Sequence, residues 1–447
     1  MAPSKPYRRN RKHHARKGAE AAPTGQAPLL VAIDSLAWGG DGVGRCDGKV
    51  IFTPLTAPGD QAEVSIVADH RSYARASLRT LLRESPGRVA PPCPVFGACG
   101  GCQWQHVAYE EQLAAKGSIL ADALSRIGKI ALPGELRVVP SPQEYGYRHR
   151  TRLQVRSSGE GPALGFFRTA SHDIVPVEQC PLLQESLNKL LLLLTKTIAK
   201  HPRFFRKVAD LSLSTDFSGR QVRVAISGRS EDAALPAETA QHLAAQAGKR
   251  GVDIFFAANE ERPLALGPGQ ESLLVTGNTF TQVNLPQNLR LVEEVVSLAR
   301  PAEGETVLDL YCGTGNFTFP LAGRGASVLG IDTGGPSIRC ARQNARRLEA
   351  AVEFRRDGAE SAVVTLAAEG RHFDLVVLNP PRAGAKEAVA ELHRLRPSRV
   401  VMISCDPATF ARDAATLNGH GYTLSDLRAF DLFPQTFHFE TVGLFTR

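Results

Sequence analysis

The chain has 447 residues, of which 43% are hydrophobic and 22% charged, and its formal net charge is +8. This length exceeds what one hydrophobic core usually supports, so we expect two or three domains, and the ordinary composition excludes a largely disordered protein. Its 8 cysteines are too few for a disulfide scaffold, and no apolar run approaches the roughly 20 residues that span a membrane. We therefore expect a cytoplasmic protein with no membrane partner.

Residues 1–28 form a basic tail that contains seven Lys or Arg residues and one acid, Glu20. The rest of the chain is almost balanced in charge. A tail of this kind binds phosphate backbones by releasing counterions, and it is equally typical of a solvated, disordered terminus. Composition leaves both interpretations open.

Residues 29–92 predict a small antiparallel β-barrel. Short runs rich in Val, Ile and Leu are separated by glycine-containing turns at 39–42, 47–48 and 58–60. Strands of this length with turns at regular spacing are typical of barrels, and many small barrels bind oligonucleotides. The fold alone does not establish such binding.

Residues 93–284 predict a central mixed α/β domain that contains a cysteine cluster. Cys93, Cys99 and Cys102 stand in C-x5-C-x2-C spacing, and Cys180 supplies a candidate fourth ligand. In a reducing compartment, clustered cysteines indicate a metal more often than a disulfide. Four thiolates suit a tetrahedral zinc ion and an iron–sulfur cluster equally well on spacing alone.

Two helices are expected in this central region. One covers 109–128, where apolar residues recur at helical spacing, and the other lies near 184–200. A predicted strand between them places Arg150 and Arg152 on one face.

Residues 285–447 predict a doubly wound, mainly parallel sheet, because strands alternate with helices. The first strand runs into Asp-x-x-x-Gly-x-Gly at 309–315, a turn that lets a ligand lie against bare backbone. The next strand ends at Asp332, whose carboxylate can accept both hydroxyls of a ribose. No third glycine follows Gly315 as it would in a nicotinamide dehydrogenase, and a later strand ends at Asn379 of Asn-Pro-Pro-Arg. Together these features match class I methyltransferases.

Cys405 follows the strand RVVMIS directly. An isolated cysteine at a strand end is usually inert core. However, C5 of uracil or cytosine is too weak a nucleophile to accept a methyl group unless a thiolate first adds at C6. A base must then remove the C5 proton before the thiol can leave. A cysteine and a carboxylate are therefore the minimum catalytic set for that chemistry.

The chain resembles the RNA uridine-5 methyltransferase family through FTQVN at 280–284, DLYCGTGNF at 309–317, SCDP at 404–407 and HFETV at 438–442. The resemblance covers nearly the whole chain. It implies that Cys405 is the nucleophile and that Glu440 takes the C5 proton. It also implies that S-adenosylmethionine is bound by Gln282, Tyr311, Asn316, Asp332, Asp357 and Asn379.

The front half resembles the rRNA-directed type within this family. Residues 29–92 are similar to the TRAM domain, an RNA-binding β-barrel, and CGGCQ is similar to a stretch that binds a [4Fe-4S] cluster. The resemblance implies that this cluster has four cysteine ligands, which are Cys93, Cys99, Cys102 and Cys180. It further points to 23S rRNA as the substrate, and we expect a monomer with no DNA partner.

Two positions depart from the family pattern. The family usually has Asp where this chain has Asn379, and Glu where it has Asp332. The second change keeps the charge, whereas the first leaves an amide that accepts one hydrogen bond but also donates. The alternatives are a tRNA uridine or RNA cytosine C5-methyltransferase and a non-catalytic RNA-binding assembly factor. For stacking against a flipped-out uridine we expect Arg150, Arg152 and Phe437.

Overall fold

The structure is a computed structural model that describes residues 20–21, 27–158, 161–229, 235–257, 262–277 and 279–447. The chain divides into two units, the first comprising Met1–Ala37 and Asp41–Arg88 and the second comprising Trp38–Gly40 and Val89–Arg447. The predicted basic tail, 1–28, lies almost wholly outside the described residues. Within the described part of the chain, no helix is long and apolar enough to cross a membrane.

The first unit is a closed five-stranded β-barrel with a short extra strand at its edge. Its strands are β1 (Glu20–Ala21), β2 (Leu29–Leu36), β3 (Gly42–Cys46), β4 (Lys49–Thr53), β5 (Gln61–Asp69) and β6 (Tyr73–Arg83). They pair in the order β1-β5-β2-β3-β4-β6, and β6 closes the ring by pairing with β5. The prediction of a wholly antiparallel barrel is wrong for one pair, because β4 and β6 run parallel. An odd number of strands cannot alternate in direction around a closed ring, so one parallel pair is required.

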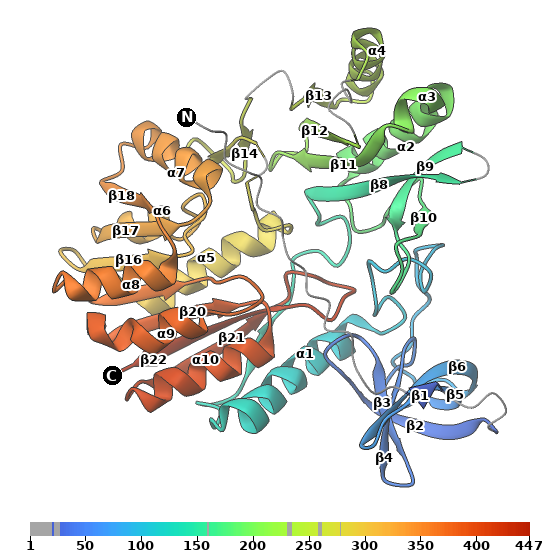
Figure 1. The fold of residues 1–447 in the computed structure, drawn as a ribbon, viewed down its shortest axis with the longest axis horizontal. Coiled ribbons are helices and arrows are strands. Elements are labelled where there is room, and N and C mark those ends of the chain that lie inside the picture. The colour runs from blue at the N-terminus through green and yellow to red at the C-terminus, as the bar shows by residue number, and fades with distance from the viewer. Residues whose placement is uncertain (1–19, 22–26, 159–160, 230–234, 258–261, 278) are drawn as a thin grey trace. The chain divides into compact units, whose positions relative to one another are not determined.

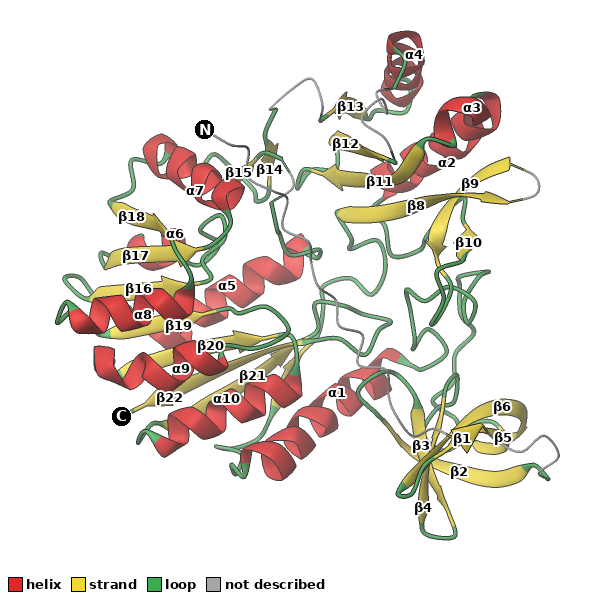
Figure 2. Ribbon diagram, in the orientation of Figure 1, coloured by secondary structure: helices red, strands yellow, loops and turns green. Residues whose placement is uncertain are grey.

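The central part of the second unit is a six-stranded sheet covered by helices (Figures 1 and 2). Its order is β10-β9-β8-β11-β12-β13. The strands are β8 (Arg150–Ser158), β9 (Gly161–Phe167), β10 (Ile174–Pro176), β11 (Val208–Thr215), β12 (Gln221–Gly228) and β13 (Asp253–Phe256). The helices are α2 (Glu185–Lys200), α3 (Pro202–Phe205) and α4 (Ala237–Gly248). Leucines along one face of α2, among them Leu187, Leu190 and Leu194, are buried against Leu153 and Leu211 of the sheet. The helix predicted near 184–200 is confirmed.

The C-terminal part is an eight-stranded sheet of order β18-β17-β16-β19-β20-β22-β21-β7. The first five strands of that order are parallel, whereas β22 is antiparallel to both β20 and β21. The strands are β7 (Arg137–Val139), β16 (Thr306–Leu310), β17 (Ser327–Asp332), β18 (Val352–Arg356), β19 (Leu375–Leu378), β20 (Arg399–Ser404), β21 (Thr423–Phe430) and β22 (Glu440–Thr446). The predicted doubly wound sheet is confirmed.

Helices cover both faces of this sheet (Figure 2). They are α5 (Leu285–Ala299), α6 (Thr318–Ala322), α7 (Gly335–Arg347), α8 (Ala359–Ala368), α9 (Lys386–Leu392) and α10 (Pro407–Gly419). Successive strand residues enter different cores: Val307 packs with α5 and α6, and Leu308 packs with α8, α9 and α10. Such continuous apolar strands are expected of a parallel sheet that is buried on both sides. A separate hairpin, β14 (Leu264–Ala265) and β15 (Leu274–Val275), precedes α5.

The C-terminal sheet also takes in residues that the sequence assigned to the central domain, 93–284. Helix α1 (Tyr109–Ala123), extended by a π-helical turn (Leu124–Gly128), packs into the same core as α8, α9 and α10. Strand β7 pairs in parallel with β21 at the edge of the sheet. Two segments that precede the central sheet in sequence therefore complete the C-terminal one.

Candidate active site

Five of the predicted site residues lie at the carboxyl ends of consecutive parallel strands. They are Tyr311 after β16, Asp332 at the end of β17, Asp357 after β18, Asn379 after β19 and Cys405 after β20. Because parallel neighbours end at the same edge of a sheet, these side chains come from one edge although they are spread over about a hundred residues of chain. Ligands of open α/β sheets bind at this edge.

A cavity of about 820 Å³ opens beside the first of these strands. Gln282, Tyr311, Asn316 and Asn379 line it, so the structure brings four of the six predicted cofactor residues together. Its remaining walls come from the glycine turn, from α5 and α6, from the β14–β15 hairpin loop at 266–273 and from the turn at 348–351. This mixture of apolar walls and a few amide groups is typical of small-molecule sites.

Asp332 and Asp357 are not among the residues that line this cavity. Asp332 instead braces the turn, because its carboxylate accepts hydrogen bonds from Gly313 N at 3.0 Å and Gly334 N at 2.6 Å. Asp357 accepts one from Ser361 Oγ at 2.8 Å near the start of α8. Both carboxylates are thus held by neighbouring loop and helix residues.

The glycine turn requires backbone that other residues rarely adopt. Gly315 has a φ of +94°, and a Cβ there would lie 2.4 Å from the ring of Phe319. Next to it, the side chains of Asn316 and Asn288 of α5 exchange two hydrogen bonds of 2.9 and 3.0 Å. The amide of Asn316 is therefore fixed by a helix that precedes the sheet.

Asp309, the first residue of the Asp-x-x-x-Gly-x-Gly turn, is fully buried. Burial raises its pKa to about 7, although Thr318 Oγ1 donates a hydrogen bond to it at 2.5 Å. This contact joins the end of β16 to the first residue of α6, so Asp309 closes the turn around the cavity.

Cys405 and Glu440 lie at the ends of two neighbouring antiparallel strands. Ser404, the last residue of β20, pairs with Thr441 of β22, so Cys405 directly follows this pair on one strand and Glu440 directly precedes it on the other. Burial raises the pKa of the Cys405 thiol to about 12, and the Glu440 carboxylate adds to the rise. Asp406, which follows the cysteine, caps α10 by accepting hydrogen bonds from Ala408 N and Thr409 N.

Glu440 is 4% exposed, and its Oε2 has no hydrogen-bond partner in the described part of the structure. Burial raises its pKa to about 8, whereas the guanidinium of Arg382 acts in the opposite direction. A carboxyl group whose pKa lies close to neutral pH can both accept and release a proton there, which suits it to proton transfer.

Sequence reasoning missed the partnership between Arg382 and His438. Arg382 Nη2 lies 3.4 Å from His438 Nε2. Burial lowers the pKa of His438 to about 4, and the nearby cations contribute to the fall, so the imidazole is neutral at pH 7. Both residues lie in stretches already singled out, Asn-Pro-Pro-Arg and HFETV, but only the contact between their side chains shows that these stretches meet.

The four predicted cluster cysteines line a single cavity. Three come from the loop before α1, and Cys180 comes from the loop before α2. Burial raises the pKa of Cys102 to about 12, and the thiols of Cys180 and Cys99 raise it further. Within the described residues, no three His, Cys, Asp or Glu side chains are grouped closely enough to hold a single metal ion. The cysteine ligand set therefore stays a prediction.

Two of the residues expected to stack on a flipped-out base are engaged by the protein itself. Arg150 donates to Thr279 O at 3.1 Å and Thr281 Oγ1 at 3.2 Å. Arg152 forms an ion pair with Asp210 at 2.6 Å. Phe437 packs its ring against Trp38 with 5.0 Å between centroids and neighbours His438.

Comparison with known proteins gives consistent matches along the chain. Residues 108–447 match the model of the family described as tRNA (Uracil-5-)-methyltransferase, and residues 29–78 match the TRAM domain. A protein of Pectobacterium carotovorum named 23S rRNA (uracil(1939)-C(5))-methyltransferase RlmD is 33% identical, over 98% of this chain and 97% of that protein. An Aeromonas hydrophila protein with the same name is 35% identical, over 93% and 95% respectively.

A solved structure agrees with these sequence matches. The tRNA (uracil-54, C5)-methyltransferase of Pyrococcus abyssi, in complex with S-adenosyl-L-homocysteine, superposes with a TM-score of 0.72 at 28% identity. The match covers 94% of this chain and all of that one. A tRNA enzyme can therefore share nearly the full length of this chain, so length does not separate the rRNA-directed from the tRNA-directed type.

Proposed function

The chain belongs to the tRNA (uracil-5-)-methyltransferase family, and we infer that it is an RNA (uracil-C5)-methyltransferase that acts on a uridine of 23S rRNA. The single observation that supports the chemistry is that Cys405 and Glu440 flank the last β20–β22 pair, Ser404 with Thr441, closely enough for Glu440 to raise the pKa of the thiol. The choice of rRNA rests on relatives of 33% and 35% identity that align over almost their whole length and carry that name. The TRAM match adds an RNA-binding module. No observation favours a cytosine methyltransferase or a non-catalytic factor.

In the reaction, the thiolate of Cys405 adds to C6 of the uracil, which gives C5 the character of an enolate carbon. S-adenosylmethionine supplies the methyl group that C5 accepts. Glu440 then removes the proton from C5, and the electron pair of that C–H bond restores the C5–C6 double bond while the Cys405–C6 bond breaks. The thiolate leaves, and 5-methyluridine is released.

The surroundings of Cys405 and Glu440 suit these two roles. The guanidinium of Arg382 favours the anionic form of both groups, because it lowers the pKa of each. Glu440 is close enough to raise the pKa of the thiol, so the two anions disfavour each other. This repulsion is avoided if the thiolate forms while Glu440 is protonated. Glu440 then ionises once the sulfur of Cys405 is bonded to C6.

For the methyl donor we propose the cavity beside β16, with Gln282, Tyr311, Asn316 and Asn379 in contact with it. Its amide groups and bare glycine backbone fit a ligand that combines a nucleoside with an amino acid. We propose that Asp332 and Asp357 act at the far end, Asp332 on the ribose and Asp357 near the adenine. An amide at Asn379 retains an acceptor for the donor or for uracil.

We propose that Cys93, Cys99, Cys102 and Cys180 bind a [4Fe-4S] cluster. Supporting this, the four thiols line one cavity, and the pKa values of Cys99, Cys102 and Cys180 are raised by burial and by neighbouring thiols, which a bound cation would reverse. Arg148 lines the same cavity, and its Nε is buried without a hydrogen-bond partner among the described residues, so it offers a positive charge to an anionic cluster. The cluster would tie the loop before α1 to the loop before α2.

The cluster proposal is tested by metal and sulfide analysis of anaerobically purified protein. We expect about four iron and four sulfide per chain, with Cys102→Ser losing both while the exposed control Arg126→Ala keeps them. One zinc per chain without iron would contradict the proposal.

The substrate is tested with labelled S-adenosylmethionine and three RNAs: 23S rRNA, total tRNA and a 23S rRNA transcript in which the methylated uridine is replaced by cytidine. We expect label only in the first, and only with Cys405 present. Label in tRNA alone would overturn the rRNA assignment.

We further propose that the enzyme acts as a cytoplasmic monomer and has no DNA substrate.

A further inference from the structure

The segment between β21 and β22, residues 431–439, leads directly into Glu440. Five polar backbone atoms in its first half are bound by residues that come from 103–147. These contacts are Asp431 N with Val139 O, Lys116 Nζ with Phe433 O, Tyr147 Oη with Pro434 O, Gln435 N with Gln112 Oε1, and the amides of Gln103 and Trp104 with Gln435 O. A loop that precedes a catalytic strand is thus held by a distant part of the chain.

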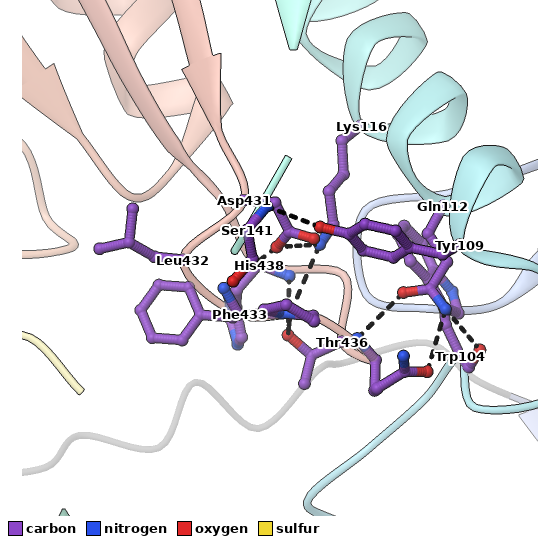
Figure 3. Close-up of polar contacts among 12 residues, drawn as sticks. Trp104, Tyr109, Gln112, Lys116, Ser141, Asp431, Leu432, Phe433, Thr436 and His438 are labelled. Atoms are coloured by element: carbon purple, nitrogen blue, oxygen red, sulfur yellow. Dashed lines mark hydrogen bonds and ion pairs between the residues drawn. The ribbon is translucent and has the colours of Figure 1, made fainter. Parts of the chain in front are cut away.

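Gln112 of α1 makes the most specific of these contacts. Its Oε1 accepts from Gln435 N at 2.9 Å, and its Nε2 donates to Gln435 Oε1 at 3.0 Å (Figure 3). The same Nε2 lies within hydrogen-bond distance of Trp104 O and Val107 O. Gln112 is fully buried and Gln435 is 2% exposed, so no water replaces these bonds at the surface.

Lys116, one turn further along α1, holds the beginning of the same segment. Its Nζ lies 2.6 Å from Asp431 Oδ1, and neither side chain is exposed. The same carboxylate oxygen accepts from Phe433 N at 3.1 Å. Figure 3 shows Lys116 extending from α1 toward Asp431. At its other end the loop is closed by Thr436, whose Oγ1 donates to Phe433 O and accepts from His438 N.

We propose that Gln112 is a positioning residue for Glu440: by fixing Gln435, it sets the path of the loop and hence the placement of the base relative to the C5 proton. This inference rests on the proposed function. Gln435 lies only five residues before Glu440, and a buried loop with alternative hydrogen-bond partners would shift the first residue of β22. A misplacement of about 1 Å can slow a chemical step about 100-fold.

The proposal predicts which step fails. Cys405 directly follows β20 and lies outside the loop, so addition of its thiolate to C6 and transfer of the methyl group to C5 proceed. Removal of the C5 proton slows, and the Cys405–C6 bond therefore persists. The protein then accumulates as a covalent adduct with methylated RNA, which a merely destabilising substitution does not produce.

The test compares wild-type protein with Gln112→Leu, and with Gln241→Leu on the exposed face of α4 as the matched control. Each full-length protein is incubated with 23S rRNA and labelled S-adenosylmethionine, and adducts are counted on denaturing gels. We expect Gln112→Leu to raise the methylated adduct fraction and to slow release roughly 10- to 100-fold, with unchanged affinity for S-adenosylmethionine. Gln241→Leu should behave as wild type.

Two further variants make each outcome decisive. Glu440→Gln should trap the adduct; if it does not, the proposed function fails. If Glu440→Gln traps the adduct and folded Gln112→Leu does not, only the positioning role of Gln112 is overturned. Should Gln112→Leu not fold, Gln435→Ala removes the side-chain bond from Gln112 Nε2, although Gln435 N still donates to Gln112 Oε1, and the same criterion applies to it.

Discussion

Burial controls the protonation of the two proposed catalytic groups. The pKa of Glu440 is raised to about 8 and that of Cys405 to about 12, in both cases first by loss of solvent. Arg382 opposes both shifts and is exposed enough to contact RNA phosphate. If the guanidinium pairs with a phosphate of the RNA, its effect on the pKa values of Cys405 and Glu440 should weaken.

Release of the methylated product should depend on pH through Glu440. The group acts as a base only when deprotonated, and its pKa lies above the ordinary value of 4.5. The release rate is therefore expected to rise about tenfold per pH unit below about pH 8 and to level off above it. Single-turnover release measured from pH 6 to 9.5 checks this, and a flat profile over that range would contradict it.

The buried ion pair between Lys116 and Asp431 should be costly to break. Neither side chain is exposed, so removing one leaves the other charge buried and unpaired. Lys116→Ala should lower the free energy of unfolding by about 3–5 kcal/mol. Lys189→Ala, which removes a surface pair with Glu185, should cost much less, because solvent screens that pair. Urea denaturation of both variants measures the difference, and equal losses in the free energy of unfolding would show that burial does not raise the cost of breaking the pair.

At the level of elements, the carboxyl ends of the parallel strands explain why the site could be predicted at all. An apolar strand pattern followed by Asp, Tyr, Asn or Cys can be recognised in the sequence. Parallel pairing then brings these side chains to the same edge of the sheet. The closeness of Cys405 and Glu440 could not be seen this way, because it depends on β22 inserting antiparallel between β20 and β21. Strand order is a long-range property that local patterns do not determine.

The role of α1 was also hidden in the sequence. Gln112, Lys116, Leu120 and Leu124 follow one another every four residues and all are buried. The helical spacing of apolar residues such as these two leucines correctly predicted that this face of the helix packs into a core. The two polar residues on the same stripe looked like surface positions, because Lys and Gln are rarely buried without a partner. Their partners, Asp431 and Gln435, are more than three hundred residues away in the chain.

The glycine turn of the cofactor cavity gives a prediction at this scale. Gly315→Ala should weaken binding of S-adenosylmethionine at least about tenfold, because a Cβ would meet the Phe319 ring at 2.4 Å and shift the turn. Gly370→Ala is the matched control, since Gly370 also has a positive φ but a Cβ there meets nothing within 4 Å. Calorimetric titration compares the two, and equal affinities would remove the turn from the binding site.

Considered as a whole molecule, the chain combines an RNA-binding barrel, a cysteine-rich connection and a catalytic sheet. The second unit is one folded entity, since α1 and β7 from its beginning complete the sheet at its end. The sequence predicted the barrel, the central α/β region and the doubly wound sheet, and it resembles the family that the comparisons identify. The sequence assigned 109–139 to the central domain because these residues directly precede that domain's strands along the chain. In the structure, β7 pairs with β21 and α1 packs against the helices of the C-terminal sheet.

The basic tail should contribute to RNA affinity. Residues 1–28 hold seven Lys or Arg residues against one acid. If they bind phosphate, deleting them should reduce the slope of log K against log salt concentration by about 0.9 for each phosphate that the tail neutralises. Filter binding to 23S rRNA at several salt concentrations measures the slope, with S-adenosylmethionine affinity as the unaffected control. An unchanged slope would show that the tail does not bind the RNA.

The central claim is that Cys405 attacks the uridine and Glu440 completes the reaction. Its most direct test is mass spectrometry of nuclease-digested Glu440→Gln protein after incubation with 23S rRNA and S-adenosylmethionine. We predict a peptide containing Cys405 that carries one methylated uridine, absent from the double variant Cys405→Ala/Glu440→Gln. Free 5-methyluridine formed by Cys405→Ala protein, or an adduct on any other residue, would contradict it.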